Sequence, residues 1–356
     1  MPTIETVSVR TAPAYEVAIG PGLLDQCGAR LAPLLGPCRT AVIADSTVAP
    51  LYLERVTASL AKAGFTVSTH LFPAGEAHKT LSTLGTLLDS LAAVPLTRRD
   101  CVVALGGGVT GDMAGFAAAV YLRGIHCVQL PTTLLSAVDS SVGGKTAVDL
   151  PAGKNLVGAF LQPSAVLCDT DCLASLPRDT LADGAAEAIK TGVLFDPALF
   201  HRFAQGGWDA SPAGLIARCV RCKADVVERD EKEQGERKLL NLGHTVGHAI
   251  ERCSGYTLPH GHAVAAGLAV IARASERLGW AEAPLSAEIT ACLEANALPT
   301  APYGFSAKAL AQAALSDKKR SGDTITLVIP RRIGHCTLEQ LPVTDLVSVI
   351  SAGWEA

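Results

Sequence analysis

The sequence predicts an α/β domain with a parallel sheet, followed by a mainly α-helical domain. Three observations favour this fold class. Strand patterns alternate with helical patterns over residues 1–177, a glycine-rich turn follows one of the strands, and almost every pattern from Arg178 onward is helical. The chain of 356 residues is long enough for two cores, so we expect domains at 1–177 and 178–356.

The composition excludes several functional classes. Apolar residues make up 49% of the chain and charged residues 18%, which indicates a compact protein rather than a disordered one. The net charge of −4 does not favour nucleic-acid binding, and no apolar run reaches the roughly 18 residues of a membrane span. The N-terminus lacks a signal-peptide pattern, so we expect a cytoplasmic protein that binds neither nucleic acid nor membrane.

The eleven cysteines form an odd, scattered set. In a chain that is not exported, this pattern is typical of reduced thiols that are buried as small apolar side chains. Cys219 and Cys222 form a CxxC, but it stands alone in a helical, basic context, so it does not predict a redox or zinc pair.

The N-terminal half alternates between strands and helices. Residues 1–20 predict a two-stranded hairpin that turns near Ala12-Pro13. Because helices separate the later strands, their sheet should be parallel with helices on both faces. Strands are expected at 39–45, 65–71, 100–105 and 125–130, with a further strand that ends with Cys168-Asp169, and helices are expected at 22–35, 51–63 and 81–92.

The strand at 100–105 leads into a glycine-rich turn. Gly106, Gly108 and Gly111 match GxGxxG, a pattern that lets a backbone approach a dinucleotide pyrophosphate at a helix N-terminus. The acid usually found about 20 residues later is missing. Asp45, at the end of an earlier strand, could contact the ribose instead, although Asp45 and Glu76 could equally be turn or cap residues.

A second glycine-rich segment, Asp139 to Thr146, ends in GGKT. Asp139 occupies the position of the first glycine that a Walker A loop requires, so the segment does not predict an NTPase. What remains is a loop that presents Lys145, followed by a second basic loop at Gly153-Lys154-Asn155. Lysines on such loops suit an anionic small molecule, and solvated loop lysines are an equally good interpretation.

Four histidines lie within nineteen positions of the C-terminal half. His244 and His248 are four residues apart, which places them on one helix face, with Asn241 one turn earlier. His260 and His262 follow, and the spacing does not say which of the four bind metal. A catalytic zinc usually takes three protein ligands, often with one carboxylate, so a Glu or Asp from elsewhere is expected.

The rest of the C-terminal half predicts packed helices and one strand. Glu187 lies among alanines at 183–190, where it is either a helix-surface residue or the missing metal ligand. Further helical patterns occur at 217–228, 239–251, 263–278 and 287–295, and a basic turn at 317–320 precedes a strand at 324–329.

Together these motifs resemble the 3-dehydroquinate synthase family over nearly the whole chain. One position departs from the family, which commonly has His-Gly-Glu-Ala-Val where this chain has His260-Gly261-His262-Ala263-Val264. The matching motifs are Gly75-Glu76 with Lys79, Gly106 to Asp112, Pro131-Thr132-Thr133, Asp139 to Lys145, Lys154-Asn155, Glu187 with Lys190, Lys223, Arg237, Asn241 to Glu251, His260-Gly261 and Asp317-Lys318-Lys319.

The resemblance implies an NAD-binding, Rossmann-like α/β domain and a helical metal-binding domain, with the active site in the cleft. It implies Glu187, His244 and His260 as ligands of zinc or cobalt. The glutamate that His262 replaces is expected to be a neighbour of the metal rather than a ligand, and His262 could compete with His260 for the metal. The implied NAD contacts are Asp45, Glu76, Lys79, Gly107, Gly108, Asp112, Thr132, Thr133, Lys145, Lys154, Cys172 and Ser175.

The implied substrate is a sugar acid phosphate, 3-deoxy-D-arabino-heptulosonate 7-phosphate. The family converts it to 3-dehydroquinate and phosphate by transient oxidation with NAD, β-elimination, reduction and an intramolecular aldol step. Its anionic groups need charge-assisted donors. The implied pocket residues are Asp139, Lys145, Lys154, Asn155, Lys190, Lys223, Arg237 and Asn241.

Within that pocket, Arg237 is expected to bind the carboxylate, because its planar fork suits one. Asn155, His248 and the Lys318/Lys319 turn are expected to bind the phosphate. The family is usually dimeric, so Arg123 is expected to reach the phosphate region from a second subunit.

Three other functions are alternatives to this one. Another sugar-phosphate cyclase, acting on sedoheptulose 7-phosphate or glucose 6-phosphate, would not need the carboxylate site to which Arg237 and Asn241 point. A polyol or glycerol-phosphate dehydrogenase of the same architecture would release NADH. A catalytically silent, metal-stabilised binding protein would not need so complete a set of motif residues.

Overall fold

The computed structural model describes residues 4–206, 211–315, 320–321 and 323–354. The chain divides into unit 1, Met1–Leu176 with Pro212–Lys232, and unit 2, Pro177–Ser211 with Glu233–Ala356. The first break is next to the expected boundary at residue 177. A single boundary at residue 177 does not describe the division, however, because the later helical segment Pro212–Lys232 belongs to unit 1. Helical periodicity shows that a segment is amphipathic but not which core it joins.

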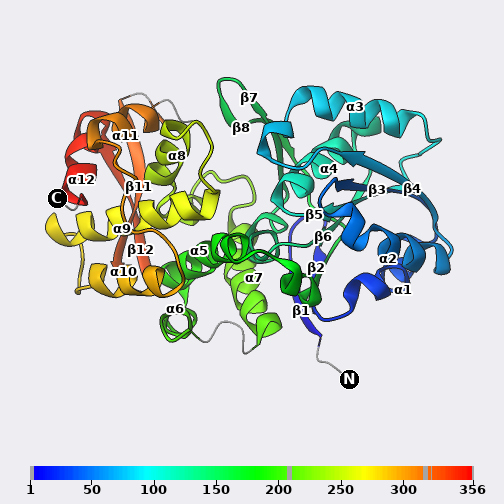
Figure 1. Cartoon of the computed structure of the whole chain (residues 1–356), viewed down its shortest axis with the longest axis horizontal. Helices are drawn as coiled ribbons and strands as arrows, with labels where there is room; N and C mark the ends of the chain where they lie inside the picture. Colours follow the sequence, from blue (N-terminus) through cyan, green and yellow to red (C-terminus); the bar gives the residue numbers. More distant parts are fainter. Residues whose placement is uncertain (1–3, 207–210, 316–319, 322, 355–356) are drawn as a thin grey trace. The chain divides into compact units, whose positions relative to one another are not determined.

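Unit 1 is built around a seven-stranded sheet in the order β1-β2-β9-β6-β5-β3-β4 (Figure 1). Only the N-terminal hairpin is antiparallel, and every other neighbouring pair is parallel, which confirms the predicted sheet. The strands are β1 (Glu5–Val9), β2 (Tyr15–Gly20), β3 (Arg39–Asp45), β4 (Thr66–Phe72), β5 (Cys101–Gly106), β6 (His126–Pro131) and β9 (Ala165–Asp169).

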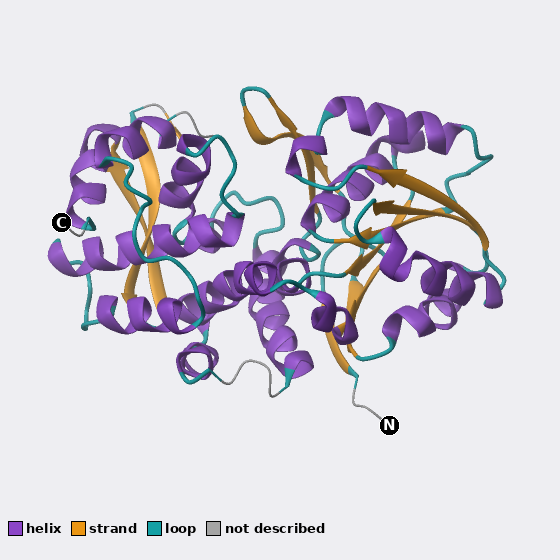
Figure 2. Ribbon diagram, viewed as in Figure 1, coloured by secondary structure: helices purple, strands orange, loops and turns teal. Residues whose placement is uncertain are grey.

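Helices cover both faces of this sheet (Figure 2). Successive residues of β3 show why, since Val42 packs into the core shared with α1 and α2, and Ile43 into the core shared with α3 and α4. A strand that is buried on both faces reads as a continuous apolar run, as this one does. The helices are α1 (Leu23–Leu35), α2 (Ala49–Lys62), α3 (Leu81–Ala92) and α4 (Gly108–Val120).

The strand order reverses between β3 and β5. The chain leaves β3 through α2 towards β4 on one side, and leaves β5 through α4 towards β6 on the other. In open α/β sheets, ligands bind outside the carboxyl ends of the strands at such a point. Asp45 ends β3 and Gly106 ends β5, so both lie at this edge.

The two basic segments expected as loops are instead a hairpin, β7 (Lys145–Leu150) and β8 (Gly153–Phe160). Lys145 is the first residue of β7, and Lys154 and Asn155 lie at the start of β8. The glycines at 143, 144 and 153 suggested loops. Within the hairpin, the two strands pair closely at Gly158, where a Cβ would lie 2.0 Å from the Thr146 carbonyl oxygen.

Unit 2 is mainly helical, as predicted, and it also contains a three-stranded antiparallel sheet. The expected strand at 324–329 is the central strand β11, whereas its partner β12 was not predicted. None of the helices in the described ranges has the length and apolar character that crossing a bilayer requires. The strands are β10 (Arg320–Ser321), β11 (Thr324–Arg332) and β12 (His335–Pro342), and the helices are α5 (Arg178–Phe195), α6 (Pro197–Ala204), α8 (His244–Cys253), α9 (His260–Arg277), α10 (Ser286–Ala295), α11 (Ala307–Ala314) and α12 (Leu346–Ala352).

Candidate metal centre and nucleotide-binding edge

Glu187, His244 and His260 come together in unit 2 from α5, α8 and α9. Glu187 Oε1 lies 3.5 Å from His244 Nε2 and 3.4 Å from His260 Nε2, and the three ligand atoms lie within 4.8 Å of one another. A tetrahedral ion with bonds of about 2.1 Å separates its ligand atoms by about 3.4 Å. The spacing therefore suits a divalent ion with two imidazole ligands and one carboxylate.

The surroundings of Glu187 also fit a cation. The residue is 1% exposed, so its carboxylate lies almost entirely out of contact with water. Oε2 forms an ion pair with Lys190. Burial disfavours the charged carboxylate, but Lys190 and His260 outweigh this effect and lower the pKa of Glu187 to about 2. A buried, charged carboxylate of this kind favours a further positive partner.

Each histidine ring is oriented by a contact on its other nitrogen. His244 Nδ1 donates to the Leu242 carbonyl at 3.1 Å, and His260 Nδ1 donates to Glu251 Oε2 at 3.3 Å. Such contacts fix the tautomer of a metal-binding imidazole and leave Nε2 for the ion. We did not single out Glu251 from the sequence. Its position three residues after His248, on a helix of buried residues, is the signal that could have found it.

His248 and His262 take different positions from the three candidate ligands. The His248 ring lies 5.3 Å from the His244 ring and 5.8 Å from the His260 ring, and His248 forms a second potential ligand group with Glu251 and His260. His262 Nδ1 lies 3.2 Å from Asp183 Oδ1, and His262 belongs to no potential ligand group among the described residues.

Asn241 does not share the helix of His244, contrary to the expected continuous helix at 239–251. A 3-10 turn, η5 (Glu236–Asn241), ends at Asn241, and α8 begins only at His244. Gly243 separates η5 from α8. Its φ is 77°, and a Cβ at this position would lie 2.9 Å from the Val264 carbonyl oxygen. The Asn241 amide instead donates to Glu233 Oε1 at 3.0 Å. Arg237, also in η5, is 1% exposed.

In the metal-free protein, we expect the His260 ring to titrate well above the ordinary range of histidine. Burial disfavours the charged ring, but contacts with Glu187 and Glu251 outweigh it and raise the pKa of His260 to about 10. The unfolded value is about 6.5. The protonated ring therefore stabilises the metal-free fold fully below about pH 6.5, and this stabilisation is lost as pH rises through 10.

The measurement is an NMR titration of the metal-free protein, with the His260 signal assigned from a His260→Gln variant. We expect a midpoint far above 6.5 and an apparent metal affinity that rises with pH, because the ion displaces this proton. A midpoint near 6.5 would show that the two carboxylates do not hold the proton.

The second candidate site lies at the carboxyl edge of the unit 1 sheet. Asp45 Oδ1 accepts hydrogen bonds from the backbone nitrogens of Thr47 and Val48 at 2.9 and 3.0 Å. Asp45 Oδ2 accepts one from Thr110 Oγ1, in the first turn of α4, at 2.9 Å. Asp45 is thus a turn residue that also joins β3 to α4 at the point where the strand order reverses.

The glycines of this edge are required by close packing. A Cβ on Gly106 would lie 2.4 Å from Thr110 Oγ1, and one on Gly107 would lie 3.0 Å from Thr133 Cγ2. The N-cap of α4 is Gly107, which has no side chain to bond the first N–H groups of the helix. Thr132 donates its backbone N–H to the Gly106 carbonyl at 2.9 Å. Gly107, Gly108, Thr132 and Thr133 therefore lie together at a helix N-terminus, where an anion can bind.

Five further residues assigned by the resemblance form a connected polar group in unit 1. Lys79 follows the 3-10 turn η1 (Glu76–His78). Its Nζ lies 2.6 Å from Asp112 Oδ2 and donates to Asn155 Oδ1 at 2.5 Å. Lys154 Nζ lies 3.2 Å from Glu76 Oε1. Burial disfavours the charged Lys79, but Asp112 and Glu76 outweigh it and raise its pKa. Lys145 is exposed at the start of β7.

Replacing Lys79 with methionine should destabilise unit 1 by about 3–5 kcal/mol, because the Asp112 carboxylate, which is only 19% exposed, would lose its counter-charge. Lys154→Met is the matched control, since its pair with Glu76 is more exposed and should contribute less than about 1 kcal/mol. Urea unfolding of both variants measures the difference. Equal losses would show that Lys79 does not compensate a buried charge.

The helix that returns to unit 1 is α7 (Pro212–Arg229), which carries Lys223. Lys223 Nζ lies 2.8 Å from Asp139 Oδ1 and donates to the Asp139 carbonyl at 2.7 Å. Asp139 lies in the π-helical turn η3 (Ser136–Ser140). The structure therefore joins two residues of the implied pocket that are 84 positions apart in the sequence.

The remaining predicted residues are not joined to these groups by the contacts described. Ser175 Oγ lies 2.5 Å from the Tyr52 hydroxyl, and Cys172 belongs to the core under α1 and α2, where burial raises its thiol pKa to about 12. Arg123 is exposed in the turn η2 (Tyr121–Arg123). Lys318 and Lys319 lie outside the described residues.

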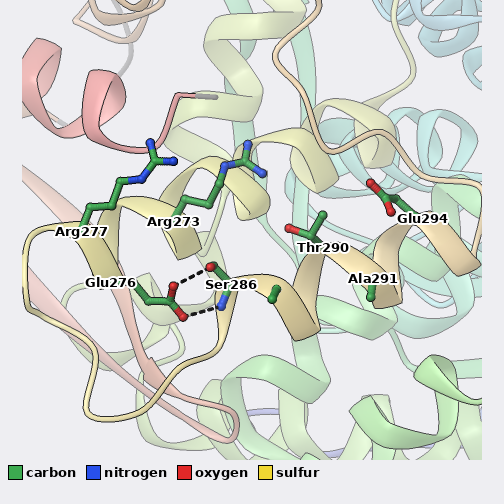
Figure 3. A pocket seen from close by; sticks show the side chains of 8 residues that line it. Arg273, Glu276, Arg277, Ser286, Thr290, Ala291 and Glu294 are labelled. Carbon is green, nitrogen blue, oxygen red and sulfur yellow. Dashed lines mark hydrogen bonds between the residues drawn. The ribbon is translucent and has the colours of Figure 1, made fainter. Parts of the chain in front are cut away.

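A hollow of about 440 Å³ lies elsewhere in unit 2, between α9 and α10 (Figure 3). Arg273 and Arg277 line it together with Glu276 and Glu294, so its charges balance. Glu276 accepts hydrogen bonds from the Ser286 nitrogen and hydroxyl at 2.8 and 2.6 Å. None of its lining residues belongs to the candidate metal centre.

The fold places the chain in a class that contains sugar-phosphate cyclases and dehydrogenases. A 2-deoxy-scyllo-inosose synthase complexed with carbaglucose-6-phosphate, NAD+ and Co2+ is 26% identical, with a TM-score of 0.87 over 97% of this chain and 99% of that one. A Streptomyces hygroscopicus 2-epi-5-epi-valiolone synthase with NAD+ and Zn2+ bound is also 26% identical, with a TM-score of 0.86 over 95% and 96% of the two chains. A glycerol dehydrogenase from Schizosaccharomyces pombe, 17% identical with a TM-score of 0.63 over 95% and 88% of the two chains, shares the fold.

Within this class, the chain belongs to the 3-dehydroquinate synthase family. The family's N-terminal part matches residues 69–183, and its C-terminal part matches residues 184–320. The 3-dehydroquinate synthase of Neisseria meningitidis serogroup B is 46% identical over 97% of this chain and 98% of its own. The Caulobacter vibrioides enzyme is 49% identical over 92% of this chain and 94% of its own.

Proposed function

We propose that this chain converts 3-deoxy-D-arabino-heptulosonate 7-phosphate to 3-dehydroquinate and inorganic phosphate, the second step of the shikimate route. The conversion comprises transient oxidation of a secondary alcohol, β-elimination of phosphate, reduction and intramolecular aldol closure, so the enzyme is a carbon–oxygen lyase. The observation that carries the proposal is the buried Glu187 carboxylate between the Nε2 atoms of His244 and His260, in a chain that matches the family over nearly its full length.

NAD and a divalent ion, Zn2+ or Co2+, are the cofactors in this proposal. A bound ion would lower the pKa of a coordinated hydroxyl, and bound NAD would accept a hydride and return it. The fit of the three ligand atoms supports the ion, and the glycine-rich start of α4 supports the dinucleotide. The residues proposed to hold NAD are Asp45, Glu76, Lys79, Gly107, Gly108, Asp112, Thr132, Thr133, Lys145, Lys154, Cys172 and Ser175.

The chain's own polar residues bind and orient the substrate in this proposal. Arg237 takes the carboxylate, because a guanidinium binds one through two parallel hydrogen bonds. Asn155, His248 and Lys319 take the phosphate, whose departure needs positive charge and donors around its oxygens. The residues proposed to line the rest of the pocket are Asp139, Lys145, Lys154, Lys190, Lys223 and Asn241.

The active form proposed here is a homodimer in the cytoplasm. Arg123 is exposed and ends a short turn with a φ of 66°, so its side chain is available to a neighbouring subunit's substrate. A phosphorylated sugar acid and NAD are intracellular metabolites, which supports the cytoplasmic location.

An assay of three products tests the function. The purified protein is incubated with the heptulosonate phosphate, NAD+ and Zn2+ or Co2+, and phosphate, 3-dehydroquinate and NADH are followed together. We expect phosphate and 3-dehydroquinate in equal amounts without net NADH, and no phosphate from sedoheptulose 7-phosphate or glucose 6-phosphate. Net NADH would indicate a dehydrogenase, and turnover of a neutral sugar phosphate would indicate another cyclase.

A further inference from the structure

We propose that Asp183 is a positioning residue for the metal centre, and that it acts through His262. Asp183 lies on α5, the helix that carries Glu187, and His262 lies on α9, the helix that begins with His260. The inference rests on the metal centre of the proposed function. It concerns two residues that ligate nothing themselves and hold the helices of two ligands in register.

The first turn of α9 depends on α5 for its cap. The N-cap of α9 is Pro259, which provides no side-chain acceptor for the first N–H groups of the helix. Asp183 provides that acceptor from outside. Its Oδ1 accepts the backbone N–H of His262 at 3.0 Å and lies 3.2 Å from His262 Nδ1. A single carboxylate oxygen thus holds both the backbone and the ring of one residue.

The two helices meet backbone to backbone at the same place. A Cβ on Gly261 would lie 2.0 Å from the Asp183 carbonyl oxygen and 2.8 Å from Asp183 Oδ1. Gly261 lies between His260 and His262, so this close approach occurs within the helical turn that carries the candidate metal ligand His260. The Asp183 and His262 side chains are 17% and 15% exposed, so water competes little for their contact.

The contact between Asp183 and His262 fixes the relative positions of the two helices that carry Glu187 and His260. Asp183 and Glu187 are four residues apart on α5, so they face the same side of the helix. The first turn of α9 presents His260 to Glu187 and His262 to Asp183. Metal ligands must be held within about 0.5 Å of their productive positions. The contact of Asp183 with His262 is what prevents the first turn of α9 from rotating or fraying away from Glu187.

Three variants test the proposal in the full-length protein. Asp183→Ala removes the acceptor, and Asp183→Asn retains a neutral one. Asp196→Ala is the matched control, because Asp196 caps α6 in the same unit by accepting the Leu199 N–H at 3.0 Å. Zinc affinity is measured by competition with a chromophoric chelator, and the ligand geometry by the absorption spectrum of the Co2+-loaded protein. The parent protein, measured first, establishes whether the metal centre exists.

Asp183→Ala should bind zinc about tenfold more weakly than the parent and show a changed cobalt spectrum. Asp183→Asn and Asp196→Ala should bind zinc as the parent does. If Asp183→Ala does not fold, His262→Ala replaces it, with an expected loss of about threefold because only the ring contact is removed. Parent-like affinity and spectrum in Asp183→Ala, or an equal loss in Asp196→Ala, would overturn the proposal.

Discussion

Glu187→Ala should lose its bound metal and at least about a thousandfold in kcat/KM. Metal coordination contributes several kcal/mol to stabilising the transition state, and each 1.36 kcal/mol is about a factor of ten in rate. Glu187 is the one carboxylate in the candidate ligand group, and its Oε1 faces both histidines at 3.4–3.5 Å. Metal content is measured by mass spectrometry of the purified protein and activity by phosphate release.

The control for Glu187→Ala must separate metal loss from damage to the fold. Removing Glu187 also breaks its buried ion pair with Lys190, which should destabilise metal-free unit 2 by about 3–5 kcal/mol. Glu187→Gln retains the shape and should lose the metal equally. Glu276→Ala removes a carboxylate that caps α10 in the same unit, and it should keep the metal. Full metal occupancy in Glu187→Gln would remove Glu187 from the ligand set.

Gly106→Ala should weaken NAD binding by about tenfold or more and lower the free energy of unfolding by about 1–3 kcal/mol. The new Cβ would lie 2.4 Å from Thr110 Oγ1, so Thr110 must move and give up its hydrogen bond to Asp45. That bond joins β3 to α4 at the edge proposed to bind the dinucleotide. Isothermal titration calorimetry with NAD+ and urea unfolding measure the two effects.

Gly85→Ala is the matched control for this prediction. Gly85 lies inside α3, and apart from its chain neighbours and the adjoining backbone of its own helix, no atom lies within 4 Å of the position that a Cβ would take. Alanine is favoured over glycine in a helix by about 1 kcal/mol, so Gly85→Ala should be neutral or stabilising and should bind NAD as the parent does. Unchanged NAD affinity in Gly106→Ala would place the dinucleotide elsewhere.

The sequence was most informative where local pattern and long-range packing agree. The strand at 39–45 was predicted with the bounds of β3, because an apolar run between Arg39 and Asp45 suits burial on both faces. The histidine spacing was informative for the same reason, since residues four apart on a helix share a face. It could not select among four histidines, and the resemblance supplied the choice of His244 and His260.

Other features depend on partners that are distant in the sequence. The helix α7 joins unit 1, where Lys223 contacts Asp139 from 84 positions away. The hairpin of β7 and β8 was expected as loops because its glycines are also loop formers, whereas Gly158 is required by the strand opposite. Neither feature follows from local periodicity or turn propensity.

The break before α8 has a similar cause. The pattern at 239–251 is helical throughout, but Gly243 has a φ of 77° and packs against the backbone of α9. Asn241 therefore lies in a separate turn, and the prediction that it lies one turn before His244 on the same helix was wrong. The contact of Glu251 with His260 also crosses from α8 to α9, so it becomes visible only in three dimensions.

Removal and return of the metal tests the central claim most directly. Protein stripped by a chelator should release no phosphate from the heptulosonate phosphate, and one equivalent of Zn2+ or Co2+ per chain should restore turnover. Full turnover by the stripped protein, with its metal content verified as zero, would contradict a divalent ion held by Glu187, His244 and His260.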